Sequence, residues 1–346
     1  MNRTWTVLRT ALGWAFSPEG DPARGLQLVG YSDWLWRELG MVREQRRWCE
    51  LALTCVDGAT PPSVEARIRL GLGWDFYGGD TGRLPHNLRA IELLRQAARL
   101  SCWGRRWCRL GYRPPAIYSD VTEAKLYNGE ALSVLRPSGR TKVLANALMV
   151  ASAIRRYVGD SQAALAFARQ ALALSKALGD VRRHDFYEAH LSISAFAAGE
   201  LAAAIDRARR AVEASRLHGN LTAEFMAQRC LAAFLILDDQ VKQGHAAALQ
   251  ALELSRQLWV NLPGSIDLIA LVLAMHGETD TVTRLTGFAD GYADRHQLRR
   301  GHIITPIRSR LVGRLHAAMS PHECQAAMTA GATWSEQEAV AVAQAA

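Results

Sequence analysis

Three stretches of the chain carry the same helical pattern at a constant shift of 40 residues. They read QAALAFARQALALSKALGD (162–180), AAAIDRARRAVEASRLHGN (202–220) and KQGHAAALQALELSRQLWV (242–260). Aligned without a gap, they coincide in four columns: Ala168, Ala208 and Ala248; Ala171, Ala211 and Ala251; Leu172, Val212 and Leu252; and Ser175, Ser215 and Ser255. Alanines three residues apart lie on one face of a helix, where their small side chains let a neighbouring helix approach closely. The period therefore predicts stacked helical repeats.

Each repeat is predicted to be a pair of helices. The preceding stretches LANALMVASAIRRYV, HDFYEAHLSISAFAA and EFMAQRCLAAFLILD recur at the same shift. Turns between the two helices are expected at Gly159-Asp160, Gly199-Glu200 and Asp238-Asp239, because glycine ends helices and aspartate caps the helix that follows.

The same signal continues more weakly towards the N-terminus. An alanine followed by a branched apolar residue recurs at Ala131-Leu132, Ala90-Ile91 and Ala52-Leu53, and Gly40 and Gly79-Asp80 fall where turns are expected. We therefore predict an all-α, right-handed superhelix of about six tetratricopeptide-like helix pairs, closed by a C-terminal helical cap.

Two features divide the predicted superhelix into three segments. Residues 102–120 should hold the first helix of the third unit, but Pro114-Pro115 cannot lie inside a helix, so we expect an irregular connection there. After Pro263 the 40-residue pattern ends. The predicted segments are N-terminal repeats at 1–120, regular repeats at 121–260 and the helical cap at 261–346.

The cap carries recognisable helix-start signals. Ser320 is followed by Pro321 and, three residues on, by Glu323, which predicts a capping box with proline at the first helical position. The last 24 residues are predicted to form two short helices divided by Gly331, the second one capped by Ser335.

Composition and charge point to an ordinary folded chain without a membrane span. Of 346 residues 49% are hydrophobic and 21% charged, and the net charge is +8. The N-terminal apolar stretch is too short for a signal peptide or a membrane helix, and no cysteine has zinc-ligand spacing, so we expect reduced cysteines and a cytoplasmic location. Arginine clusters occur at Arg46-Arg47, Arg105-Arg106, Arg155-Arg156, Arg182-Arg183, Arg207 to Arg210 and Arg299-Arg300. We interpret them as solvated helix faces in preference to a nucleic-acid site, although spacing alone does not show whether they converge.

The sequence holds none of the searched catalytic motifs. It has no phosphate-binding Gly-x-x-x-x-Gly-Lys-Ser/Thr loop, no His-Glu-x-x-His and no Gly-x-Ser-x-Gly. His184 and His190 are six residues apart, which does not place both rings on one helix face. Asp185 with Glu188 is interpreted as an exposed acidic edge. We therefore expect no enzyme activity, no cofactor and no metal.

Tryptophans are concentrated near the N-terminus, at Trp5, Trp14, Trp34, Trp36 and Trp48. A ligand-stacking surface and core packing both fit this cluster, and core packing is favoured because large aromatic side chains dominate the cores of small bundles.

Both ends of the chain resemble one family of bacterial regulators. The motifs are Leu8 to Leu12, Trp14-Ala15, Gly20-Asp21, Trp34 to Trp36, Arg46 to Trp48, and Gly331 to Ala339. They are similar to the helical domain that follows the nucleotide-binding module in signal-transduction ATPases, especially transcriptional regulators with an N-terminal winged helix. In that family the domain is a sensor and interaction surface, whereas DNA binding and ATP hydrolysis lie upstream. Because this chain begins at the repeat domain, those two activities are not carried over, and we expect a separated sensor or a free-standing adaptor.

Function is accordingly predicted to be non-catalytic regulation through a protein, peptide or small effector. A winged-helix or nucleotide-binding regulator is one expected partner; an adaptor scaffold joining two proteins is the alternative, and nucleic-acid binding through the arginine clusters is a third. In such superhelices the first helix of each pair lines the inner face. Polar residues predicted there to contact the partner are Asn146, Glu188, Ser192, Gln228 and Arg229.

Overall fold

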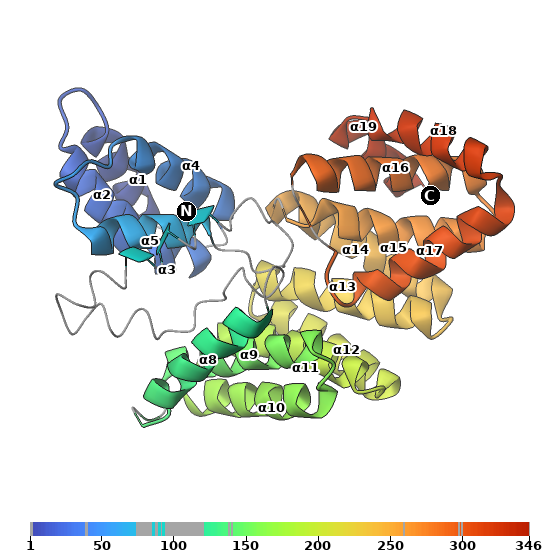
Figure 1. Cartoon of the computed structure of the whole chain (residues 1–346), viewed down its shortest axis with the longest axis horizontal. Coiled ribbons are helices and arrows are strands. Elements are labelled where there is room, and N and C mark those ends of the chain that lie inside the picture. Colours follow the sequence, from blue (N-terminus) through green and yellow to red (C-terminus); the bar gives the residue numbers. More distant parts are fainter. Residues whose placement is uncertain are drawn as a thin grey trace.

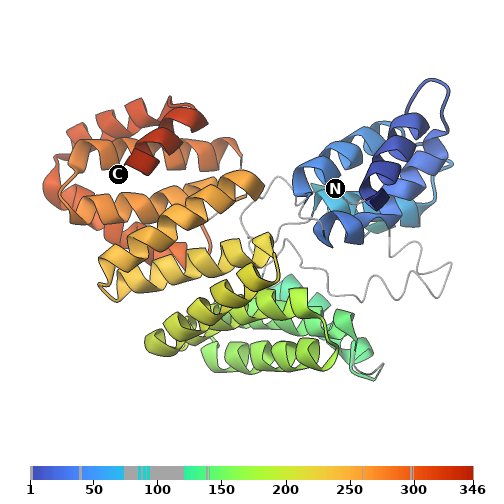
Figure 2. The same ribbon diagram turned by 180° about the vertical axis from the view of Figure 1, so that it is seen from behind.

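The structure, a computed structural model, describes most of the chain as helices. The described residues are 3–38, 41–73, 85–86, 89–90, 92–93, 121–137, 139, 141–258, 260–296, 298 and 300–345. Within these ranges every regular element is an α-helix. An N-terminal bundle, a stack of helix pairs and a C-terminal group of helices follow one another (Figures 1 and 2). The predicted irregular connection at 102–120 and the predicted turns at Gly40 and Gly79-Asp80 lie outside the described residues.

The N-terminal bundle is built around tryptophan. It comprises α1 (Arg3–Ala15), α2 (Pro22–Tyr31), α3 (Asp33–Glu38), α4 (Val42–Thr54) and α5 (Pro62–Leu72). Trp5, Trp36 and Trp48 are buried in its core, and the rings of Trp5 and Trp36 meet edge to face at 4.7 Å. Core packing is thus confirmed for these three. Trp14 instead has an exposed side chain.

The central helices begin every 20 residues, so two helices make up one predicted 40-residue repeat. After α8 (Val121–Leu135) and α9 (Lys142–Tyr157) come four helices of 17 residues each: α10 (Ser161–Ala177), α11 (Val181–Ala197), α12 (Leu201–Leu217) and α13 (Leu221–Leu237). Their first residues are 20 positions apart, and α14 (Val241–Leu258) continues the series.

A left-handed backbone residue follows each helix from α9 to α13. The positive φ angles fall at Gly159, Gly179, Gly199, Gly219 and Asp239. Glycine has no Cβ and adopts this conformation without steric cost, which is why it is suited to helix C-termini. The predicted turns at Gly159, Gly199 and Asp238-Asp239 are therefore confirmed, and Gly179 and Gly219 mark two turns between repeats that were not predicted.

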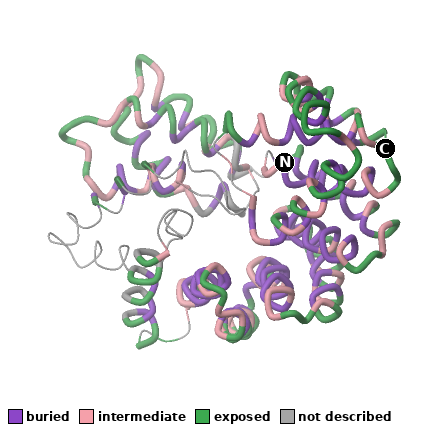
Figure 3. Tube along the Cα trace, turned by 45° about the vertical axis from the view of Figure 1, so that its right-hand side comes forward, coloured by how far each residue is buried: buried purple, intermediate pink, exposed green. Residues whose placement is uncertain are grey.

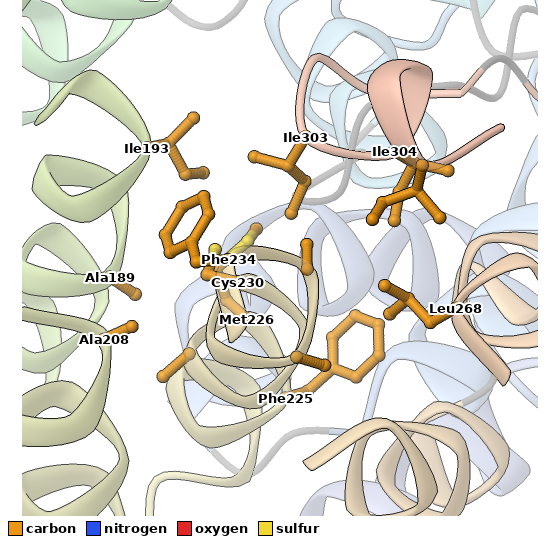
Figure 4. Close-up of a cluster of buried hydrophobic side chains, with 14 of the residues drawn as sticks. Ala189, Ile193, Ala208, Phe225, Met226, Cys230, Phe234, Leu268, Ile303 and Ile304 are labelled. Atoms are coloured by element: carbon orange, nitrogen blue, oxygen red, sulfur yellow. The ribbon is translucent and has the colours of Figure 1, made fainter. Parts of the chain in front are cut away.

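The paired helices form two layers. The first-layer helices α9, α11 and α13 pack on one another, while α10 packs between α9 and α11, α12 packs between α11 and α13, and α14 packs on α13. Buried residues gather where the layers meet (Figure 3). The alanine columns lie at this contact and are completely buried, with Ala208 of α12 facing Ala189 of α11 (Figure 4). The all-α, tetratricopeptide-like superhelix predicted from the 40-residue period is confirmed.

The C-terminal helices continue the same core. They are α15 (Leu262–Met275), α16 (Thr279–Arg295), α17 (Ile304–Ala318), α18 (Pro321–Ala332) and α19 (Glu336–Ala345). Ile303, at the start of α17, points towards Phe234 of α13 and Ile193 of α11 (Figure 4). One hydrophobic cluster extends from Leu132 to Ala343 and so crosses residue 260 without interruption. The division into three segments stays a prediction.

Four charged side chains fasten α17 to α15 and α16. Asp267 is fully buried and accepts hydrogen bonds from Arg300 (2.5 Å) and Arg308 (3.2 Å); Asp290 accepts from the same two arginines at 2.6 and 2.5 Å. Burial lowers the pKa of Arg300, but the two carboxylates outweigh it and raise that pKa above its ordinary value. We call these residues the charge clasp; their charges cancel. Arg300 was predicted to lie on a solvated face, so that interpretation is wrong for it.

Two glycines bring α16 and α18 into backbone contact. A Cβ on Gly287 would lie 2.0 Å from the Met328 carbonyl oxygen, and one on Gly331 would lie 1.9 Å from that of Arg284. The predicted division at Gly331 is therefore wrong: this glycine lies within α18, and the break comes at Thr333. The capping signals are confirmed, because Ser320 and Glu323 form a capping box and Ser335 pairs with Glu338 in the same way.

The close crossing leads to a stability prediction. Gly287→Ala or Gly331→Ala should lower the free energy of unfolding by about 1–3 kcal/mol, because the backbones must move apart. Gly313→Ala is the matched control: its Cβ would meet nothing within 4 Å in the middle of α17, so it should raise stability by about 0.5–1 kcal/mol. Urea unfolding followed by circular dichroism measures all three; equal effects at the three positions would contradict the crossing.

Candidate binding site in the inner layer

Polar side chains interrupt the first-layer helices at positions that are apolar in neighbouring repeats. Arg156 of α9 occupies the position of Phe196 in α11 and Ile236 in α13. Ser194 of α11 likewise corresponds to Phe234 of α13. All of these residues except Phe196 are buried. The repeat therefore does not need polar groups here, and a buried polar group is the informative exception in a core.

Arg156 ties two first-layer helices together. Its Nη1 atom donates to the Ser194 hydroxyl at 2.9 Å and to the Ser152 hydroxyl at 3.2 Å, and the two hydroxyls are 3.0 Å apart. The guanidinium group is charged at all physiological pH values, so it brings a permanent positive charge into the layer.

Cys230 of α13 lies among three polar side chains: Ser192 and Arg229, which were predicted to contact a partner, and Arg156, which was not. Burial raises the pKa of its thiol to about 11, although the charges of Arg229 and Arg156 and a hydrogen bond with Ser192 act in the opposite direction. These four side chains, with Ser152 and Ser194, form what we call the inner polar cluster. A thiol with this pKa is protonated at neutral pH, so it is a poor nucleophile and a poor metal ligand.

Arg229 contributes a second buried guanidinium group. Its Cζ atom lies 5.4 Å from the centre of the Phe225 ring, and Nη2 lies 3.5 Å from the sulfur of Met226. Cation–π contacts of this kind stabilise a charge that is largely removed from water.

The segment before α17 closes the cluster from the C-terminal side. Burial and the nearby charge of Arg156 lower the pKa of His302 below its ordinary value. His302 is therefore neutral at physiological pH, and it borders the cluster next to the residues of the charge clasp.

The five residues predicted to contact a partner fall into two groups. Ser192, Gln228 and Arg229 are buried; Ser192 and Arg229 meet around Cys230. Asn146 and Glu188 are partly exposed, and the Glu188 carboxylate pairs with Arg207 (3.2 Å) and Arg210 (3.7 Å) of α12. Partner contact at these positions stays a prediction, and only the second group is accessible without rearrangement.

Sequence analysis missed Ser152, Arg156 and Ser194. Arg156 was interpreted as part of a solvated helix face, which is wrong because the residue is buried. The 40-residue alignment identifies Arg156 and Ser194, each of which stands in a column otherwise filled by apolar residues, whereas Ser152 shares its column with Ser192 and Ala232.

Asp185 was also misplaced by the sequence pattern. It was assigned to an exposed acidic edge, but it is completely buried and its carboxylate lies 2.9 Å from Nδ1 of His218 at the end of α12. In the neighbouring repeats the same two positions hold Ala145 with Leu178, and Phe225 with Leu258. A hydrogen-bonded polar pair thus stands in one repeat where apolar residues stand in the other two.

The described part of the chain contains neither a group of metal-binding side chains nor a membrane-spanning helix. Among its residues, no group of three or more His, Cys, Asp or Glu side chains could hold a metal ion. No helix in the described ranges is long and apolar enough to cross a membrane. Of the four described cysteines, Cys49, Cys230 and Cys324 are buried.

Comparison with known proteins supports the fold. The chain is similar to the crystal structure of the apo form of RapI, with a TM-score of 0.51 and 10% identity over 84% of this chain and 86% of that one. A Rap protein complexed with Competence and Sporulation Factor gives a TM-score of 0.47 and 8% identity over 86% and 99%. No protein-family model and no curated protein matches the sequence. The RapI likeness supports a tetratricopeptide-like helical fold and nothing finer.

The Asp185–His218 pair gives a test of the repeat register. His218→Leu alone should lower the free energy of unfolding by about 3 kcal/mol, because it leaves a buried carboxylate without its partner. The double substitution Asp185→Ala with His218→Leu recreates the pair at positions 145 and 178 and should unfold within about 1 kcal/mol of the parent. Chemical unfolding of the single and double variants decides this; a double variant as unstable as the single one would show that the repeats are not interchangeable there.

Cysteine reactivity tests the inner polar cluster. In the folded chain Cys230 should resist alkylation by iodoacetamide at pH 8, because its thiol is buried and its pKa is raised to about 11. The partly exposed Cys55 serves as an internal control that should react first. Peptide mapping by mass spectrometry at pH 7, 8 and 9 gives both rates; equal labelling of Cys230 and Cys55 would contradict the placement.

Proposed function

We propose that this chain is a non-catalytic regulatory domain that recognises a protein or peptide through its first-layer helices. The observation that carries the proposal is the inner polar cluster. Two buried arginines and three buried serines occupy a layer whose other repeats show that apolar residues satisfy the fold.

The energetic cost of the cluster supports a functional origin. A buried hydroxyl or guanidinium group costs free energy unless its hydrogen bonds are made, and apolar side chains of similar volume are often at least as stable. A chain that keeps polar residues where Phe196, Phe234 and Ile236 stand in other repeats gives up stability at that place. Recognition of polar groups on a partner is a function that compensates for such a loss.

The class of partner follows from the resemblance of the two chain ends to regulator ATPases. We infer a winged-helix or nucleotide-binding regulator as the partner, with this chain as its sensor. The motifs from Leu8 to Ala339 follow the order that the resemblance implies, which supports this inference, and an adaptor that joins two other proteins is the alternative.

Affinity capture of the tagged full chain from its native cells tests the proposal. The accessible predicted contacts are changed one at a time, by Asn146→Ala and Glu188→Gln, and Gln250→Ala on the exposed face of α14 is the control. Loss of one central contact should reduce the recovered partner about fivefold, as expected for about 1 kcal/mol.

Quantitative mass spectrometry of the captured proteins distinguishes the outcomes. A winged-helix or nucleotide-binding protein lost with both inner-layer variants supports the sensor function. A partner recovered equally by all variants would exclude the first-layer helices as its binding site, and the absence of any stoichiometric partner would contradict protein recognition.

A further inference from the structure

A cation recurs at the same register in four successive second-layer helices. Arg136, Lys176, Arg216 and Arg256 are 40 residues apart, at or just after the last turns of α8, α10, α12 and α14, and all four are exposed. These positions were not among the arginine clusters that the sequence emphasises, because each is a single residue.

Side-chain contacts show that the turns following these cations lie side by side. The Lys142 ammonium group at the start of α9 is 3.1 Å from the Asp180 carboxylate at the start of α11. The Asn220 amide at the start of α13 donates to the backbone carbonyl of Arg182 at 2.9 Å. Three successive turns between repeats therefore form one continuous edge of the superhelix.

The charge of this edge is strongly positive. The described residues of 136–144, 176–184, 216–224 and 256–264 contain seven Lys or Arg against two Asp or Glu, a balance of +5 in a chain of net charge +8. The turns within repeats have the opposite sign: residues 156–164, 196–204 and 236–244 contain two cations against four carboxylates. We call the positive side the basic edge.

Helix dipoles account for part of the pattern. A cation in the last turn of a helix is stabilised by the partial negative charge there. This explains one cation per second-layer helix, but it does not explain Lys142, Arg182 and Arg183, which lie at helix starts, where the dipole disfavours them.

The basic edge also exposes aliphatic side chains. Leu217 is 82% exposed, Val181 45% and Leu221 43%. Val181 and Leu221 are the first residues of α11 and α13 in equivalent positions, and Leu217 ends α12 between them. Large aliphatic side chains between cations are typical of a protein-binding surface.

The two carboxylates of the basic edge do not cancel its positive charge. Asp180 is buried and pairs with Lys142 and Arg183, and Glu224 pairs with Arg216 at 2.7 Å. Even in these pairs the cations remain accessible, since half of the Arg216 side chain and 61% of the Lys142 side chain are exposed.

We propose that the basic edge docks an acidic, amphipathic segment of a partner protein. The carboxylates of this segment would pair with the four cations spaced by 40 residues, and its aliphatic side chains would pack on Val181, Leu217 and Leu221. This proposal rests on the protein-binding function proposed above and adds a second surface to it. Successive repeats are on the order of 10 Å apart. Carboxylates spaced by about three residues in an extended segment, or about seven in a helix, match that distance.

A protein segment fits the edge better than a nucleic acid does. The arginine cluster Arg182-Arg183 belongs to the basic edge, but other clusters lie elsewhere: Arg155-Arg156 lie at the end of α9, Arg207 to Arg210 lie in the middle of α12, and Arg300 belongs to the charge clasp. A phosphate backbone offers no apolar partner for Leu217, whereas an amphipathic segment does.

Fluorescence anisotropy with defined probes tests the proposal on the full chain. The probe is a labelled 20-residue peptide with glutamate at every third position and leucine and serine between. Binding at 50 mM NaCl should fall at least about tenfold in the variant Lys176→Glu/Arg216→Glu/Arg256→Glu. The control Arg169→Glu/Lys242→Glu/Arg314→Glu changes the net charge equally at exposed positions off the edge and should bind like the parent.

Two further probes separate the possible ligands. Leu217→Ser should weaken peptide binding several-fold while leaving a 20-base-pair DNA duplex unaffected. Tighter binding of the duplex, or of phosphatidylcholine vesicles with phosphatidylserine, would overturn the proposal, as would equal losses in both triple variants or no peptide binding by the folded parent. In the capture experiment, the edge variant could recover the partner normally while Glu188→Gln loses it. That result would contradict docking on the basic edge and would leave the function proposed for the first-layer helices unaffected.

Discussion

The constraint on which the rest of the structure depends is the constant 20-residue spacing of left-handed turn residues. One extra residue in any helix would rotate all later side chains of that helix by about 100°. Because α10 to α13 have equal lengths, side chains 40 residues apart recur at the same height, which places Ala168, Ala208 and Ala248 at equivalent contacts. Asp239 is the one non-glycine member of the series. Its left-handed backbone is less costly for aspartate than for most residues, and Arg310 of α17 pairs with its carboxylate at 2.6 Å.

Much of the fold could be predicted from the sequence because the same local signals recur in each repeat. The alanine columns, the turns at Gly159 and Gly199 and the capping box at Ser320 are local signals, and each has one dominant physical cause. Gly331 shows the limit of such signals. A glycine can end a helix or allow two helices to touch, and only the position of Arg284, 47 residues away in sequence, decides between them. The prediction for Asp185 was wrong for the same reason. Its partner His218 lies at the end of another helix, and the periodicity of α11 alone predicted an exposed side chain.

The candidate site was less predictable than the fold, because its polar residues depart from the pattern of the repeat. Ser192, Gln228 and Arg229 were predicted as polar residues on first-layer helices, but the repeat showed neither that they are buried nor that the segment before α17 lies near this layer. Ile303 and His302 close the inner layer from that segment, and the charge clasp holds it with two carboxylates and two guanidinium groups. Balanced charges at 2.5–3.2 Å make this attachment specific in geometry without adding a long-range field.

In the two proposals, exposed charge and buried polar groups contribute to recognition at two different places on the chain. The clasp is neutral and the turns within repeats are acidic, so most of the net positive charge of the chain is concentrated on the basic edge. Exposed charges of one sign act over roughly 8–10 Å at physiological ionic strength and mainly accelerate encounter with partners of opposite sign. Buried polar groups such as those around Cys230 bond within the chain, so a partner would meet the first-layer helices at the accessible Asn146 and Glu188, where an incorrect partner leaves polar groups without hydrogen bonds and loses affinity. A partner that is first attracted by the edge and then recognised by the inner layer would need an acidic segment and a polar contact surface on the same molecule, which narrows the class of proteins that this chain can bind.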